Sequence, residues 1–183
     1  WDYNKNINID PYTIPPTSNK KYHWICRHCK QDWISSTINC NCPNCTPKHS
    51  SIIERKLYYL FTLVFGKYNV KSSFKFHKNK EIDIFIPKYK IGIEYDGAFF
   101  HKDEKRDVLK NSLVKTHNYQ LYRIREMGLS KLKPDDYIYN SRKNLQEPFL
   151  YLVDKINKNY KLSSTELKNI EYVKTLDYDN LNI

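Results

Sequence analysis

The sequence has no cysteine after Cys45, only 4 glycines and a single methionine, and it has no long run of apolar residues. A membrane-spanning helix needs roughly 18 or more consecutive apolar residues, so we expect no membrane span and no membrane partner. With no recognisable signal peptide, we expect an intracellular protein of the cytoplasm or nucleoid, encoded by a cell, a virus, a phage or a mobile element. The low glycine and proline counts exclude a low-complexity chain.

All five cysteines lie between positions 26 and 45. The pairs Cys26-x2-Cys29 and Cys42-x2-Cys45 have the spacing of a four-thiolate Zn²⁺ site, because each turn presents two sulfurs on one side. A disulfide framework would spread cysteines more widely, although disulfides or idle thiols remain an alternative. Cys40 is a spare thiol that can replace one ligand.

Residues 1–48 also differ from the rest in composition, since they hold all three tryptophans. Hydrophobic periodicity is weak there, so we expect a metal to replace the missing core. The stretches "WDYNKN", "IPPTSNKKYHWIC", "CRHCKQDW" and "CPNC" resemble, in this order, a treble-clef or zinc-ribbon-like family, with Trp1, Trp24 and Trp33 at its aromatic positions. Lys30-Gln31 departs from the family's usual Gly-His. Such modules commonly accompany DNA-acting enzymes and often occur in tandem, which implies further zinc modules or a targeting domain upstream.

The formal net charge is +11 and the pI about 9.3. A basic chain of this size most often binds nucleic acid, because neutralising phosphates releases counterions. A lysine-rich composition inherited from an AT-rich genome is the alternative interpretation.

From residue 50 onward the sequence predicts a mixed α/β domain in the order αβββαβ, followed by helices. We expect a helix from Ser50 to Gly66, strands in "YNVKSSFKF", "EIDIFIP", "KIGIEYDG" and "YQLYRIRE", and a helix in "DEKRDVLKNSLVKTH". Further helices are predicted at about 143–160 and 164–175. The predicted domains are 1–48, a core at 49–130 and a C-terminal helical extension at 131–183.

Acidic residues occupy the polar positions of two of these strands. Asp83 lies on one strand, and Glu94 and Asp96 share one face of the next. If a hairpin joins the strands, the three carboxylates converge, which is unfavourable unless a cation lies among them. Such a cation binds a phosphate and activates water, and His101 is placed to act as a base or acid nearby.

Each residue also has a structural interpretation, and these alternatives remain open. Glu54 fits a capping box with Ser51, and Asp107 fits a helix N-terminal charge. Asp83 fits an exposed strand position, Asp96-Gly97 a turn and His101 an ordinary surface position.

As an ordered set, Glu54, "EIDIFIP", "IEYDG", His101, "RDVLKN" and "YQLYRIRE" resemble the very-short-patch-repair-like (EDxHD-type) branch of the PD-(D/E)XK nucleases, over about residues 50–127. The resemblance implies a restriction-endonuclease-like core, with a mixed sheet flanked by helices, that uses Mg²⁺ or Mn²⁺. It implies that Asp83 is the central metal ligand with Glu94 or Asp96 as partner. Glu54 would hold a metal-bound water, His101 would be the general base or acid, and Asp107 would support it.

The sequence departs from this family in two places and matches it in a third. The lysine of the E-x-K signature is replaced by Asp96. Lys102, Lys105 and Lys110 are candidates to substitute for that lysine, and they are also candidate DNA contacts. Phe99-Phe100 matches an aromatic pair that wedges into the duplex in the repair endonucleases, although packing at a strand end explains it equally well. No cysteine lies near Ala98, so the zinc site of those enzymes is missing from this loop.

Basic residues outside the acidic set are the remaining nucleic-acid contacts. Arg123 and Arg125 share one face of a strand, where we expect them to contact phosphates or to pair with acids at the surface. We expect the lysines of residues 67–80 either to bind the phosphate backbone of the nucleic acid or to be solvated on a surface hairpin.

Together these features predict a Mg²⁺-dependent DNA endonuclease that leaves a 5′-phosphate and uses the zinc module to bind DNA. The alternatives are a decayed nuclease fold that only binds DNA and an RNA-directed nuclease. Nicking, double-strand cleavage, restriction, repair-like and homing roles all remain open, as does the oligomeric state.

Overall fold

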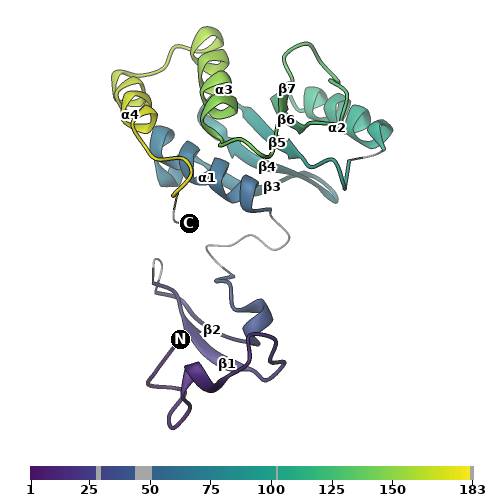
Figure 1. Cartoon of the computed structure of the whole chain (residues 1–183). Coiled ribbons are helices and arrows are strands. Elements are labelled where there is room, and N and C mark those ends of the chain that lie inside the picture. Colours follow the sequence, from purple (N-terminus) through teal and green to yellow (C-terminus); the bar gives the residue numbers. More distant parts are fainter. Residues whose placement is uncertain (28–29, 44–50, 102, 182–183) are drawn as a thin grey trace. The chain divides into compact units, whose positions relative to one another are not determined.

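The computed structural model describes residues 1–27, 30–43, 51–101 and 103–181. The chain forms two compact units, Trp1–Ser50 and Ser51–Ile183 (Figure 1). The predicted ligands Cys29 and Cys45 and the predicted DNA contact Lys102 lie outside the described residues. Among the described residues no helix is long and apolar enough to cross a membrane.

The first unit is built on a two-stranded antiparallel ribbon. Strand β1 (Tyr22–Ile25) pairs with β2 (Asp32–Ser35), and the short helices η1 (Pro11–Thr13) and η2 (Thr37–Asn39) flank it. Asn6 ties the N-terminal segment to β1, because its side chain donates to the carbonyl of His23 and accepts from the His23 amide. Trp1 packs edge-on against Trp24, with ring centroids 5.5 Å apart. The unit therefore has a small aromatic cluster in place of an extended core.

The second unit begins with helix α1 (Ile52–Phe65), where the Ser51 hydroxyl accepts from the Glu54 amide at 3.1 Å. The helix ends at Gly66, whose φ of 89° is a conformation that favours glycine. Both ends match the predicted helix. The hydrogen bond between Ser51 and Glu54 supports the capping interpretation of Glu54.

A five-stranded mixed sheet follows, in the order β3-β4-β5-β6-β7. Its strands are β3 (Lys71–His77), β4 (Lys80–Ile86), β5 (Ile91–Asp96), β6 (Gln120–Glu126) and β7 (Tyr137–Tyr139). The β3–β4 and β4–β5 pairs are antiparallel, which confirms the predicted hairpin, whereas β5–β6 and β6–β7 are parallel. The turn helix η4 (Pro87–Tyr89) joins β4 to β5.

Helices cover both faces of this sheet. Helices α1, α3 (Gln146–Asn159) and α4 (Ser164–Lys174) pack over the main hydrophobic core, which includes Ile93 and Ile124. Helix α2 (Glu104–Thr116) covers the other face, where a small apolar cluster of Val114, Phe85 and Leu121 lies at one end. Because side chains alternate along a strand, the even-numbered residues of β5 point toward α2.

Strand β7 was not predicted. It pairs with β6, and α3 and α4 contribute to the main core, so residues 131–183 belong to the same compact unit as the predicted nuclease core. A strand of three residues is too short for a period-two pattern to stand out.

Candidate active site

The predicted acidic residues gather between α2 and the sheet. Asp83 comes from β4, Glu94 and Asp96 from β5, and Asp107 from α2. This face is therefore a layer of charged groups rather than a second hydrophobic core, and Glu94 and Asp96 are 1% and 0% exposed. Burying so many charges is costly unless each is paired or binds a cation.

Asp83 and Glu94 lie beside each other across the β4–β5 pair. The Asp83 amide donates to Glu94 Oε1 at 3.2 Å, and the Tyr95 amide donates to Asp83 Oδ2 at 2.9 Å. Lys110 pairs with Glu94 Oε2 from helix α2. Among the described residues Asp83 has no ion-pair partner. Burial and the Glu94 charge raise the pKa of Asp83 well above its ordinary value, which is the environment that a bound cation would relieve.

Glu54 approaches the same group from the first turn of α1. Burial raises the pKa of its carboxyl, the Ser51 hydroxyl and amide oppose this effect, and the negative charge of Glu94 adds to it. Glu54 thus lies close enough to Glu94 and His101 for their charges to shift its pKa.

His101 returns to the acids through a short turn after β5. The Gly97 carbonyl accepts from the amides of Phe100 and His101, at 3.0 and 3.1 Å. Glu126, at the end of β6, fixes the start of this turn by accepting from the Ala98 amide at 2.8 Å. Sequence reasoning did not identify Glu126, because only the parallel β5–β6 pairing brings it beside the loop.

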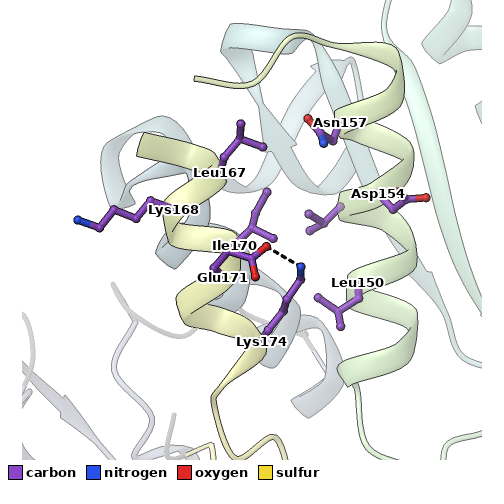
Figure 2. Close-up of a pocket in the computed structure, with 9 residues that line it drawn as sticks. Leu150, Asp154, Asn157, Leu167, Lys168, Ile170, Glu171 and Lys174 are labelled. Carbon is purple, nitrogen blue, oxygen red and sulfur yellow. Dashed lines mark hydrogen bonds and ion pairs between the residues drawn. The ribbon is translucent and has the colours of Figure 1, made fainter. Parts of the chain in front are cut away.

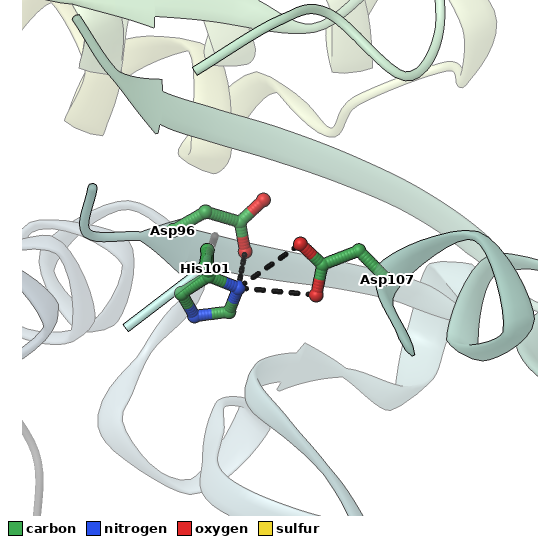
Figure 3. Close-up of side chains that lie close together, drawn as sticks. All are labelled: Asp96, His101 and Asp107. Atoms are coloured by element: carbon green, nitrogen blue, oxygen red, sulfur yellow. Dashed lines mark hydrogen bonds and ion pairs between the residues drawn. The ribbon is translucent and has the colours of Figure 1, made fainter. Parts of the chain in front are cut away.

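The His101 ring faces two carboxylates with one nitrogen. Its Nδ1 lies 3.0 Å from Asp107 Oδ1 and 3.4 Å from Asp96 Oδ1, and Nε2 points away from both (Figure 3). The ring is 27% exposed. The predicted support of His101 by Asp107 is therefore a direct contact in the structure.

Arg123 and Arg125 lie in the same layer, and this corrects their predicted role. They are 1% and 0% exposed, so neither reaches a phosphate or a surface acid. Arg123 Nη1 donates to both oxygens of Asp96, at 2.6 and 2.8 Å, and Arg125 Nη2 lies 3.3 Å from Asp107 Oδ2. Burial raises the pKa of Asp96, while Arg123 and His101 oppose it. The arginines are internal partners of the acids, not DNA contacts.

The remaining predicted DNA contacts differ in exposure. Phe99 and Phe100 are 76% and 82% exposed, and their rings contact each other edge-on at 5.0 Å. Packing at a strand end does not account for such exposure. Lys105 is exposed in the first turn of α2, whereas Lys110 reaches inward to Glu94. A separate groove of about 580 Å³ lies between α3 and α4, and it contains none of the predicted residues (Figure 2).

In the first unit, the structure describes two of the four predicted zinc ligands. Cys26 and Cys42 are each 7% exposed. The turn after Cys26 is closed by two hydrogen bonds, from the Lys30 amide to the Cys26 carbonyl and from the Cys26 amide to the Gln31 carbonyl. Buried thiolates are donors that suit Zn²⁺, and Cys26 and Cys42 are both of this kind.

A comparison with known families supports the interpretation of this unit. Residues 1–48 match a family described as a probable treble clef zinc finger domain (DUF4379). The match supports the predicted N-terminal zinc module and Zn²⁺ as its metal. No curated protein and no solved structure matches the chain.

Proposed function

We propose that this chain is a metal-dependent DNA endonuclease whose α/β unit, with a restriction-endonuclease-like fold, hydrolyses phosphodiester bonds. The observation that carries the proposal is the placement of Asp83 and Glu94 on adjacent strands, where the Asp83 amide donates to Glu94 and the Asp83 carboxylate forms no ion pair among the described residues. Carboxylates of this kind, with a histidine beside them, are suited to metal-assisted hydrolysis.

The residues divide the chemistry between them. A divalent cation such as Mg²⁺ or Mn²⁺ held by Asp83 and Glu94 would polarise the scissile phosphate and lower the pKa of a bound water. Glu54 orients the attacking water, and His101 accepts its proton at Nε2. The water oxygen forms the new bond to phosphorus, the bond to the 3′ oxygen breaks, and that oxygen takes a proton from solvent. The products carry a 5′-phosphate and a 3′-hydroxyl.

Three features support DNA as the substrate. The net charge is +11, the exposed Phe99-Phe100 pair lies immediately before His101, and a treble-clef zinc module precedes the α/β unit. Exposed aromatic rings stack on bases, and a basic surface binds the phosphate backbone. The β3–β4 hairpin at one edge of the same sheet adds further lysines, which include Lys71, Lys75, Lys78 and Lys80.

The test is cleavage of supercoiled plasmid by the zinc-loaded full chain with Mg²⁺. We expect nicked or linear product from the unaltered protein and from Glu81→Gln, which removes an exposed carboxylate of the same strand. Asp83→Asn and His101→Gln should both lose this activity. Cleavage that is undiminished in both variants would refute the site. If added RNA suppresses plasmid cleavage more strongly than added DNA does, the preferred substrate is RNA.

One observation favours a second function. The contact of Lys110 with Glu94 places a cation where a metal would compete for the same oxygen. In a decayed nuclease that only binds DNA, Lys110 would replace the metal permanently. That protein would bind DNA without cleaving it and would show no Mn²⁺ affinity dependent on Asp83.

A further inference from the structure

A second group of side chains also has the geometry of a metal site. One ligand atom from each of Asp96, His101 and Asp107 lies within 4.8 Å of the others. The proposed function therefore leaves two locations for a divalent cation: this cluster, or the Asp83–Glu94 pair beside it. The contacts around the cluster distinguish them.

The carboxylates of the cluster are already neutralised by arginine. Arg123 Nη1 occupies both oxygens of Asp96, and Arg125 lies 3.3 Å from Asp96 and 3.3 Å from Asp107. Two carboxylates thus face two guanidinium groups that stay charged at any working pH. A cation at this point would lie beside two buried positive charges.

The arginines cannot give up these partners at low cost. Arg123 Nη2 and Arg125 Nη1 are buried and have no hydrogen-bond acceptor among the described residues, so both side chains are already short of acceptors. If a metal withdrew Asp96 or Asp107, a buried guanidinium would lose its compensating charge. The arginines therefore hold the carboxylates against a competing cation.

The histidine nitrogen that faces the cluster is also engaged. With Asp107 oxygens at 3.0 and 3.1 Å and Asp96 at 3.4 Å, Nδ1 is surrounded by acceptors, an arrangement that favours the tautomer with the proton on Nδ1. A protonated Nδ1 has no lone pair for a metal, and it leaves the lone pair on Nε2 (Figure 3). The contacts of the cluster therefore favour one tautomer of His101, the one with its proton on Nδ1.

The neighbouring group has the opposite balance of charge. Glu54, Asp83 and Glu94 are three carboxylates, and Lys110 pairs with Glu94. Arg123 Nη1 lies 3.7 Å from the same Glu94 oxygen, but it lies closer to Asp96, at 2.6 and 2.8 Å. Carboxylates therefore outnumber the cations at this group, and Asp83 forms no ion pair among the described residues, which leaves room for a metal cation.

We propose that Arg123 and Arg125 exclude metal from the Asp96–His101–Asp107 cluster and hold it as a proton-transfer unit, so that a single divalent cation binds at Asp83 and Glu94. This inference rests on the proposed function. It makes Arg123 and Arg125 positioning residues, and it removes Asp96 from the set of Mg²⁺ ligands that the sequence suggested.

Titration of the zinc-loaded full chain with Mn²⁺ tests this assignment. We expect one Mn²⁺ per chain beyond the zinc, an affinity unchanged in His101→Gln, and a loss of more than about tenfold in Asp83→Asn. His77→Gln, in β3, is the control for removal of a histidine outside the cluster. His101 is partly exposed, so its variant should fold.

The outcomes separate this inference from the proposed function. Mn²⁺ affinity that falls at least about tenfold in His101→Gln, or a stoichiometry of two, overturns the inference and leaves a metal-dependent nuclease intact. No Mn²⁺ binding by the unaltered chain overturns both.

The tautomer provides a readout that does not depend on activity. Nitrogen-15 NMR of His101 in the Mg²⁺-bound protein should show a protonated Nδ1 and an unprotonated Nε2. Arg125→Lys keeps a positive charge beside Asp107 and should keep this signature, whereas Arg125→Gln should yield a mixture of tautomers. An unprotonated Nδ1 in the unaltered, Mg²⁺-bound chain would overturn the inference.

Discussion

The Asp83 amide donates to the Glu94 carboxylate across two antiparallel strands, and the Asp83 carboxylate accepts in return from Tyr95, the residue next to Glu94. Each carboxylate accepts from a backbone amide of the opposite strand, at 3.2 Å for Glu94 and 2.9 Å for Asp83. These bonds fix the carboxylates side by side, although their charges repel. The protein therefore maintains, at the cost of some stability, an arrangement that a cation would favour.

The first prediction follows from this cost. In Mg²⁺-free buffer at pH 7, Asp83→Asn should raise the free energy of unfolding by on the order of 1 kcal/mol, because ionised Asp83 is disfavoured in the folded state. The pKa of Asp83 is raised on folding, so the penalty is absent at about pH 3 and appears as pH rises. Urea unfolding at both pH values measures the difference.

The same variant should lose function while it gains stability. Its cleavage rate should fall by more than the roughly 100-fold typical of losing an outer-shell partner of a metal. Glu81→Gln is the matched control, since Glu81 is exposed on the same strand, and it should change neither quantity. A destabilised Asp83→Asn protein would contradict the assignment of Asp83 as an uncompensated charge.

The second prediction concerns Lys110, whose side chain is 18% exposed and pairs with Glu94. If Lys110 replaces the missing E-x-K lysine, it stabilises charge that develops on the phosphate, and Lys110→Met should lower the cleavage rate by about 100-fold. Mn²⁺ affinity should not fall, because the lysine competes for Glu94. Plasmid cleavage and Mn²⁺ titration measure the two effects.

Lys105→Met is the control for this variant, because Lys105 lies on the same helix but is exposed. It removes the same charge and should leave the chemical step unchanged. If Lys110→Met gains Mn²⁺ affinity and cleaves as well as the unaltered protein, Lys110 is no catalytic substitute.

Much of the second unit could be predicted from local patterns. The Ser51 cap and Gly66 mark the ends of α1, and the alternation of isoleucines marks β4 and β5. The structure also confirms the β4–β5 hairpin, which brings Asp83 beside Glu94. These features depend on residues close together in the sequence, and short-range physics determines them.

The fate of the two arginines could not be predicted in this way. An alternating strand shows that Arg123 and Arg125 share a face, but it does not show what covers that face. The parallel pairing of β5 with β6 places them opposite Glu94 and Asp96, and α2 then covers them. Both steps depend on contacts between residues distant in the sequence. The two arginines are therefore buried, although the sequence led us to expect them at the surface.

The third prediction uses the distribution of tryptophan to test the zinc module. All three tryptophans lie in residues 1–48, and helices α1–α4 all lie in the second unit. A chelator should change the tryptophan emission while the helical circular dichroism signal persists, because metal binding and folding are coupled in such modules. Restoration of the emission by Zn²⁺ is the control.

Two cysteine variants sharpen this test. Cys42→Ser should lose zinc, because Cys42 is buried within the predicted ligand set, whereas Cys40→Ser should retain it. Loss of zinc in Cys40→Ser instead would show that Cys40 is a ligand.

The fourth prediction concerns Lys30, which stands where the treble-clef family often has glycine. Its φ is 62°, in the left-handed region that disfavours residues with a Cβ atom. Lys30→Gly should therefore stabilise the zinc-loaded module by on the order of 0.5–1 kcal/mol, after the entropy cost of glycine is included. Thermal unfolding followed by tryptophan emission measures the gain. Gln31→Gly, at a residue without positive φ, should be destabilising by comparison.

The fifth prediction concerns Glu166, which anchors α4 to the β4–β5 connection. Its carboxylate accepts from Lys88 at 2.8 Å, from the Tyr89 hydroxyl at 2.7 Å and from the Ser163 amide at 2.7 Å. Burial opposes ionisation, but Lys88 and Ser163 outweigh it and lower the pKa of Glu166 to about 2. Replacement of a charged hydrogen-bond partner costs about 1.5–3 kcal/mol, and Glu166→Gln should destabilise the fold by this amount at pH 7.

The stability that Glu166 contributes should depend on pH. Because folding lowers the pKa of Glu166 from 4.5 to about 2, its ionised form contributes stability that is fully present above about pH 4.5 and is lost as pH falls toward 2. The difference in unfolding free energy between the unaltered chain and Glu166→Gln should therefore narrow between pH 7 and pH 3, as measured by urea titration. Glu171→Gln, on the same helix, removes a carboxylate that is 70% exposed and should show no such narrowing. A constant difference for Glu166→Gln at all pH values would mean that shape, rather than charge, holds α4 in place.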